Sequence, residues 1–255
     1  MKFDICSCGI VLIRTIFFTA LCLFILTAAP SKSRAEILEL QYEGFTIWID
    51  CDLRGATQFY YKAEADSGSH KRNSEYFIDP DIPKRCQQTA TSPYKHLINE
   101  TRYDRGHLVP ANHLDGSKQS INQTNFMSNI LPQAADMNRG AWLQTEEIVE
   151  CYRDLDPLEV WGGVIWGDNH EDDYFVDSHG VKTPDAFWKI IIRKDHGIAW
   201  IVPNTSQAKR RMLDKYLVSI DEIETITELT FDIPPGQKLR PLLSSWTIPK
   251  GCDKG

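Results

Sequence analysis

The chain has 255 residues, of which 42% are apolar and 25% charged, which is an ordinary balance for a soluble globular protein. Its formal net charge is −7. Because an acidic surface repels nucleic acid at long range, this charge excludes a protein that coats DNA or reads its sequence through a broad basic face, and any phosphate chemistry must be local.

The first 35 residues have the pattern of a secretory signal peptide. Lys2 gives a basic start, residues 10–29 are almost wholly apolar, and small residues precede Glu36 at the positions required for cleavage. The apolar run is also long enough to span a bilayer, so an uncleaved membrane anchor is the alternative. We expect a leader over residues 1–35, whose removal changes the formal charge to −10, and a secreted or periplasmic product without stable membrane association.

Four cysteines remain after the predicted leader: Cys51, Cys86, Cys151 and Cys252. An even number in an exported chain indicates two disulfides, for which three pairings exist. We favour Cys51 with Cys86 and Cys151 with Cys252, and buried free thiols are the alternative. No two of the four lie within five residues of each other, so their spacing fits no zinc motif.

The rest of the chain, residues 36–255, contains no repeat, low-complexity tract or Gly/Ser-rich linker, so we expect one domain. Alternating apolar and polar residues predict a strand over 43–50. Turn residues follow at 52–56, and an aromatic run predicts the second strand of a hairpin over 58–63. Residues 64–100 are rich in Ser, Asp, Lys, Asn and Pro, which is typical of a long irregular segment.

The next stretch, YDRGHLVPANH, begins at Tyr103 and gathers two histidines, an arginine, an aspartate and an asparagine within eleven residues. Gly106 and Pro110 disfavour a helix, so residues 104–108 are expected to form an extended strand or a strand end. The pattern then changes to that of a helix over 136–153, with an N-cap at Asp136.

Further along, short apolar runs rich in β-branched and aromatic residues predict buried strands. These strands are expected over 160–166, 187–192 and 197–202, and further helices over 207–217 and 221–227. Strands and helices are mixed without a regular βαβ alternation, which favours an α+β fold.

The strand over 104–108 and the helix after it can bring four reactive side chains together. Eight residues of an ideal helix turn by about 800°, so Asn138 and Glu146 point within about 80° of each other and can both face a neighbouring strand. Phosphodiester cleavage needs a base for water, which His107 supplies, and a cation against the developing phosphoryl charge, which Arg105 supplies. An amide oxygen and a carboxylate suit a hydrated Mg²⁺.

Each of these residues taken alone has a plainer interpretation. A lone strand histidine is more often structural than catalytic, and His113, which lacks partners at a suitable spacing, is expected to hydrogen-bond within its loop. Asp104 is expected to fix the backbone or pair with the neighbouring arginine, with metal binding as the alternative. The basic runs 71–72 and 209–211 are expected to be solvated, with the lining of a nucleic-acid groove as the alternative.

The run YDRGHLVPANH, followed by NFMSNILPQAADMNRGAWLQTEE, resembles the DNA/RNA non-specific endonucleases, the family of mitochondrial endonuclease G and secreted bacterial sugar-non-specific nucleases. The likeness is continuous over about residues 102–147 and continues more weakly to about Phe231, whereas residues 37–100 resemble the family only loosely. It implies the ββα-metal (His-Me finger) fold, in which one strand and one helix hold a hydrated Mg²⁺ against a mixed or antiparallel sheet flanked by helices.

The resemblance also implies a role for each matching residue. His107 is the general base, Arg105 contacts phosphate, Asn138 is the sole direct protein ligand of the metal and Glu146 holds a water of that metal. Asn129, in the SNI segment, joins the catalytic set in a supporting role. Members of the family often use a further arginine from the N-terminal region, for which the sequence leaves four candidates open: Arg54, Arg72, Arg85 and Arg102.

We therefore expect an exported Mg²⁺-dependent endonuclease, with Mn²⁺ as a substitute ion, that hydrolyses DNA and RNA with little sequence preference. The alternatives are a catalytically weak relative that binds nucleic acid or protein, and a phosphodiesterase for small nucleotides. A binding protein would tolerate loss of His107 or Asn138, and a comparison of long DNA, RNA and a dinucleotide would separate the second alternative. The sequence does not decide between a monomer, a homodimer and a complex with an inhibitor protein.

Overall fold

The structure of the protein is a computed structural model that describes residues 35–95, 102–238 and 244–254. Residues 1–34 of the predicted leader, on which the alternatives of cleavage and membrane anchoring depend, lie outside the described residues, as do residues 96–100 of the predicted irregular segment. Within the described ranges, no helix has both the length and the apolar character needed to cross a bilayer.

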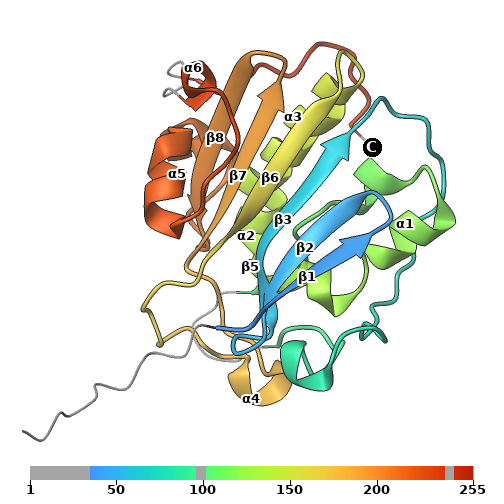
Figure 1. The fold of residues 1–255 in the computed structure, drawn as a ribbon, viewed down its shortest axis with the longest axis vertical. Helices are drawn as coiled ribbons and strands as arrows, with labels where there is room; N and C mark the ends of the chain where they lie inside the picture. The colour runs from blue at the N-terminus through green and yellow to red at the C-terminus, as the bar shows by residue number, and fades with distance from the viewer. Residues whose placement is uncertain (1–34, 96–101, 239–243, 255) are drawn as a thin grey trace, which may run out of the picture. The chain divides into compact units, whose positions relative to one another are not determined.

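A seven-stranded sheet in which every neighbouring pair is antiparallel forms the centre of the described domain (Figure 1). Its strands, in spatial order, are β1 (Ile37–Tyr42), β2 (Phe45–Asp50), β3 (Gly55–Ala63), β6 (Leu158–Ile165), β7 (Ala186–Arg193), β8 (His196–Pro203) and β9 (Leu217–Val218). The predicted hairpin and the three predicted buried strands are confirmed. β1 was not predicted, because this edge strand is half exposed and carries no buried apolar run.

The two faces of the sheet bury different residues of the same strand. On β7, Phe187 and Ile191 belong to the larger core, which includes α3 (Leu143–Arg153), whereas Trp188 and Ile190 belong to a second core with α5 (Ile220–Thr227). Figure 1 shows α3 behind the sheet and α5 beside β8. The helix predicted over 221–227 is confirmed, and the capping box of Ser219 and Glu222 fixes its start.

A separate two-stranded unit carries the motif residues. β4 (Tyr103–His107) pairs antiparallel with β5 (Ile130–Ala134), and the chain then enters a helix composed of α2 (Ala135–Met137), a π-helical turn (Asn138–Trp142) and α3. The strand over 104–108 and the helix over 136–153 are confirmed. β5 was not predicted, since Pro132 interrupts its apolar pattern. Asp136 is not the N-cap as predicted, because the helix begins one residue earlier with Ala134 as its cap.

The helix is widened at the residues that follow Met137. Ala141 donates its backbone N–H to the carbonyl of Ala208 at 3.1 Å. Gly140 lies so close to the same segment that an added Cβ would be 3.0 Å from the backbone nitrogen of Arg210. Residues 208–210 therefore support the π-helical turn from outside, a departure from regular α-helix that is frequent at functional sites.

The helix predicted over 207–217 is wrong. The carbonyl of Ala208 accepts a bond from the π-helical turn, and the N–H of Met212, its partner in an α-helix, bonds instead to Lys209 at 2.8 Å. The segment forms instead the 3₁₀ turn η5 (Arg210–Tyr216). The remaining short helices and turns are η1 (Lys84–Cys86), η2 (Ala111–Leu114), α1 (Lys118–Gln123), η3 (Met127–Asn129), α4 (Val176–His179) and α6 (Pro235–Lys238).

Two disulfides tie irregular segments to this framework. Cys51, just after β2, is bonded to Cys86, and Cys151, near the end of α3, is bonded to Cys252. These are the two pairings that we favoured. Each bond joins a regular element to a stretch that has little secondary structure of its own.

Gly106 of the DRGH motif should be intolerant of any side chain. An added Cβ would lie 2.1 Å from Oε1 of Gln133, which is fully buried, and 2.4 Å from its Cγ. We predict that Gly106→Ala lowers the free energy of unfolding by about 1–3 kcal/mol in urea titrations followed by tryptophan fluorescence. In the control Gly116→Ala the added Cβ meets nothing within 4 Å, so the change should be below about 0.5 kcal/mol. Equal stability of both variants would contradict the close approach.

Candidate active site

A cavity of about 700 Å³ lies where β4 meets the start of the helix. Four of the five predicted site residues line it: Arg105, His107, Asn138 and Glu146. Other lining residues come from elsewhere in the chain and include His70, Arg72, Tyr76, Asn112, Asp115, Arg139 and Lys254. The strand and the helix therefore bring their side chains to one cavity, although the π-helical turn departs from the ideal geometry on which the angular argument was based.

His107 is held in one tautomer by Asn125. The amide nitrogen of Asn125 donates to the backbone carbonyls of Asn73 at 2.7 Å and Glu75 at 3.0 Å, so its Oδ1 is the atom that faces His107 Nε2, at 2.9 Å. An amide oxygen only accepts, and Nε2 must therefore carry the proton. In the neutral ring, Nδ1 is left as the atom that can accept a proton.

The surroundings of His107 also keep the imidazole neutral. Burial lowers the pKa of His107 to about 3, and the positive charge of Arg72 contributes in the same direction. Arg72 Nη2 lies 3.5 Å from His107 Nδ1 and 3.0 Å from the hydroxyl of Tyr76. At neutral pH the ring is consequently in the form that a general base requires.

Arg105 and Arg72 share one aromatic ring. The guanidinium of Arg105 stacks 3.9 Å from the ring centroid of Tyr76 and donates to the carbonyl of Thr91 at 2.7 Å, while Arg72 bonds the hydroxyl of the same tyrosine. Within the described ranges, neither arginine forms an ion pair with a carboxylate. Two cations are thus positioned at the cavity wall with charge available for an anion.

The structure distinguishes the four N-terminal arginines that the sequence left open. Arg72 lines the cavity, and among the described residues the other three do not. Arg85 is paired with Glu36 at 2.7 Å, and Arg54 packs on Gly180. For Arg72, the alternative interpretation of the basic run 71–72, the lining of a groove, is therefore favoured.

Asp104 orients Asn138. The amide nitrogen of Asn138 donates to Asp104 Oδ2 at 2.9 Å, and Arg139 binds both oxygens of the same carboxylate, at 2.8 and 2.6 Å. The amide oxygen of Asn138 is therefore the atom left for a ligand. The expected structural role of Asp104 agrees with these contacts, but its arginine partner is Arg139 rather than the adjacent Arg105.

Glu146 interacts electrostatically with a buried lysine, Lys189, for which the sequence predicted no role in the site. Lys189 of β7 is fully buried, donates to Thr145 Oγ1 at 2.8 Å and lies 3.9 Å from the ring centroid of Trp142. Burial raises the pKa of Glu146, and the Lys189 ammonium opposes that rise. Lys189 lies in the strand predicted over 187–192, and its contact with the site was not predicted. The signal for it was a lone lysine inside the apolar run FWKIII.

The donors at the cavity fit a hydrated divalent cation. Asn138 offers a neutral oxygen and Glu146 a carboxylate, both hard ligands of the kind that Mg²⁺ accepts while it keeps most of its waters. In the described part of the chain, the single cluster with three metal-ligating side chains is Glu36, Cys51 and Cys86, whose cysteines form a disulfide. The described residues therefore do not offer many protein ligands to one cation, but they can form a site with few protein ligands.

Two polar residues near the motif support the fold instead of lining the cavity. Asn129 is fully buried and bonds to Val109 N and O, both at 2.9 Å, and to Thr124 O at 2.8 Å. Asn129 is not among the residues that line the cavity, and the supporting role predicted for it stays a prediction. His113 is structural as expected, although its partners are Tyr61 and Glu150 from other elements.

Comparison with known proteins agrees with this arrangement. The family model described as DNA/RNA non-specific endonuclease matches residues 27–236. Mitochondrial nuclease EXOG of Xenopus laevis is 26% identical over 68% of this chain and 51% of its own length, and human EXOG is 23% identical over 67% and 49%. Mitochondrial endonuclease G of Bos taurus is 25% identical over 80% and 69%. The chain thus spans about half the length of the EXOG relatives.

The fold also has a close parallel among solved structures. The structure of EndoG in complex with the inhibitor EndoGI superposes with a TM-score of 0.63 at 19% identity and covers 79% of this chain and 86% of that chain. At this identity the likeness concerns the fold. It confirms the predicted α+β, ββα-metal architecture.

We predict that Asn125→Asp raises the pKa of His107. A carboxylate next to Nε2 favours the imidazolium, whereas the amide oxygen carries no full charge. Titration of the ring by ¹⁵N NMR should show wild-type His107 neutral, with its proton on Nε2, well below the usual pKa of histidine, and protonated at higher pH in the variant. Asn122→Asp makes the same change in α1 without a described bond to His107 and should titrate like wild type. A proton on Nδ1 in the wild type would contradict the assignment.

Proposed function

The chain belongs to the DNA/RNA non-specific endonuclease family, and on this premise we propose that it hydrolyses phosphodiester bonds within DNA and RNA with little sequence preference. The observation that carries the proposal is the convergence of a neutral imidazole, two arginines, an amide oxygen and a carboxylate on one cavity. The curated relatives are nucleases of greater length, so the activity of this chain is argued from its own residues.

His107 is the general base of the proposed reaction. Its Nδ1 takes a proton from the attacking water, while the bond from Nε2 to Asn125 keeps the ring in one orientation. The low pKa ensures that the base is unprotonated before the reaction, and it also drives the proton off again after turnover. Asn125 is a positioning residue, since it acts through the imidazole.

Arg105 and Arg72 bind the phosphate that is attacked. Each guanidinium offers a planar set of donors to phosphoryl oxygens, and the charge on those oxygens grows as the fifth oxygen approaches phosphorus. Tyr76 holds both groups, one over its ring and one at its hydroxyl, so little rearrangement is needed when the substrate enters. Arg72 thereby takes the part of the additional N-terminal arginine.

Asn138 and Glu146 would hold a divalent cation, Mg²⁺ with Mn²⁺ as a substitute. When bound, such an ion supplies positive charge against the phosphoryl group and the leaving oxygen. Asp104 directs the amide oxygen of Asn138 toward this position, and Lys189 favours the ionised form of Glu146. Both residues act by positioning or charge and do not contact the substrate.

Little sequence preference follows from the kind of contacts offered. The groups described above address a phosphate, which is the same at every nucleotide, and phosphate contacts carry no sequence information. The chain as a whole is acidic, with a formal charge of −7. The local cations at the cavity therefore offset an unfavourable long-range field, and the substrate is held mainly at the site itself.

A nicking assay tests the proposal with two matched pairs of variants. His107→Ala should lower the rate on supercoiled plasmid and single-stranded RNA by about 10²–10⁴-fold, and Arg72→Gln by about 10²–10³-fold. The exposed His196→Ala and the ion-paired Arg85→Gln should cleave like wild type, and excess EDTA should abolish cleavage. Wild-type rates in His107→Ala would refute the assignment. Faster hydrolysis of a dinucleotide than of long DNA would favour the small-nucleotide phosphodiesterase.

We also propose that residues 1–35 direct export. The two disulfides support this proposal, because such bonds persist in oxidising compartments. The named relatives are mitochondrial, so the compartment is argued from this chain alone. Intact mass of the exported protein should correspond to a chain that starts at Glu36 with four non-alkylatable cysteines. Recovery of the full-length chain in the membrane fraction would favour the anchor.

A further inference from the structure

Residues 244–254 lie beyond the part of the chain that matches the family, which ends at residue 236. They are nevertheless fixed to the domain. The indole of Trp200 donates to Ser245 Oγ at 3.1 Å, and the backbone N–H of Ser245 donates to Asp214 Oδ1 at 2.8 Å. The segment is therefore docked onto the domain.

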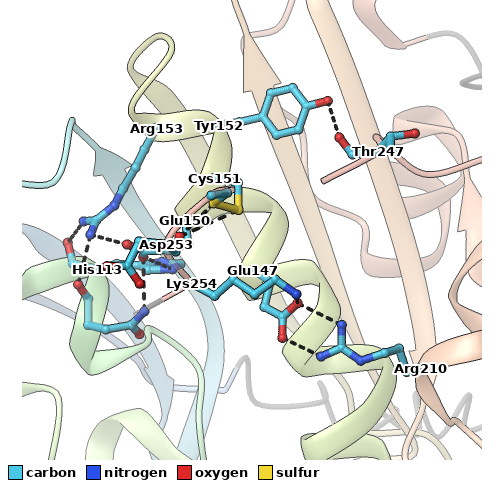
Figure 2. Close-up of a disulfide and its surroundings, with 12 residues drawn as sticks. His113, Glu147, Glu150, Cys151, Tyr152, Arg153, Arg210, Thr247, Asp253 and Lys254 are labelled. Atoms are coloured by element: carbon cyan, nitrogen blue, oxygen red, sulfur yellow. Dashed lines mark hydrogen bonds and ion pairs between the residues drawn. A yellow bond between two sulfur atoms is a disulfide. The ribbon is translucent and has the colours of Figure 1, made fainter. Parts of the chain in front are cut away.

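Three residues of the segment are bonded to α3 (Figure 2). The hydroxyl of Tyr152 donates to the carbonyl of Thr247 at 3.0 Å, Cys151 forms a disulfide with Cys252, and Glu147 forms an ion pair with Lys254 at 3.0 Å. Successive residues of the segment therefore contact α3 at positions progressively closer to the end of the helix that carries Glu146. The disulfide stands two residues before the lysine and fixes its approach.

Lys254 reaches the active-site cavity and lines it together with His107 and Asn138. Its side chain is 48% exposed, so the ammonium is accessible to a ligand. The carboxylate of Glu147 is already held by Arg210 through both oxygens, at 2.8 and 2.5 Å. The cluster of Glu147, Arg210 and Lys254 has two cations for one anion, and a single ion pair leaves further N–H donors on the lysine.

We propose that Lys254 is a substrate-binding residue whose ammonium contacts a backbone phosphate next to the one that is cleaved, and that the Cys151–Cys252 disulfide holds it in place. The inference rests on the proposed function, since it assumes a nucleic-acid strand in the cavity. A phosphate is the ligand that matches a partly exposed cation with spare donors beside a phosphodiester-cleaving site. An extra cation is also useful to a chain that is acidic overall.

Binding of fluorescein-labelled duplex DNA, followed by anisotropy over a range of salt concentrations, tests the proposal. The His107→Ala protein, which should bind without cleaving, is the parent. Adding Lys254→Gln should raise Kd severalfold and reduce the slope of log Kd against log salt by about 0.9, the loss of one phosphate contact. Lys254→Arg should restore most of the affinity. Lys250→Gln, the same change at an exposed position of the segment outside the cavity lining, should bind like the parent.

A double-mutant cycle tests the tether. Replacing Cys151 and Cys252 by serine should weaken binding by about the same factor as Lys254→Gln, and combining the changes should add little, because both remove one contact. Additive effects, or unchanged binding without the disulfide, would overturn the tether. Unchanged Kd and slope in Lys254→Gln, with wild-type enzyme that cleaves plasmid, would overturn the role of Lys254 and leave the proposed function intact. A parent that binds no DNA, with a wild type that cleaves none, would overturn both.

Discussion

The chemistry of the cavity depends on which atom of each amide side chain faces inward. Asn125 commits its nitrogen to two backbone carbonyls, and its oxygen therefore meets His107 Nε2. Asn138 commits its nitrogen to Asp104, which leaves its oxygen for a ligand. Rotating either amide by half a turn would exchange an acceptor for a donor, and would place the wrong proton on the imidazole or an N–H where a cation belongs. The hydrogen bonds made by the two amide nitrogens thus determine that the amide oxygens, which are acceptors, face His107 and the cavity.

In the same cavity, arginine side chains lie beside His107, and the imidazole stays neutral. Arg72 lies within 3.5 Å of His107 Nδ1, and its charge adds to burial in lowering the pKa of the ring. A carboxylate in that position would have had the opposite effect and produced an imidazolium that cannot accept a proton. On the helix side the signs are reversed, because the charge of Lys189 favours the carboxylate form of Glu146. A chain that is acidic overall can therefore place two arginines and an ionised glutamate in one cavity.

Local motifs were readable from the sequence, and contacts between distant segments were not. The strand with His107 and the helix with Asn138 and Glu146 follow from turn-forming residues, periodicity and the spacing of the family's motif. Arg72 was one of four equal candidates, since it lies in an irregular stretch whose path only the folded chain decides. The 3₁₀ turn after Lys209 was mistaken for an α-helix, since local periodicity does not show that Ala208 bonds to Ala141, far away in sequence. Tertiary contacts overrode local preference at these positions.

The helix that carries Asn138 and Glu146 is held at several points by different parts of the chain. Thr145 bonds Lys189 of the sheet, Glu147 bonds Arg210 and Lys254, and Cys151 is bonded to Cys252. Glu146 lies between two of these anchors and therefore has little freedom to shift. Asn138 lies outside them, in the irregular start of the helix, where its bond to Asp104 ties it directly to β4. Residues 244–254 take part in this anchoring, because Cys252 and Lys254 are bonded to α3 on either side of one turn, and Lys254 also lines the cavity.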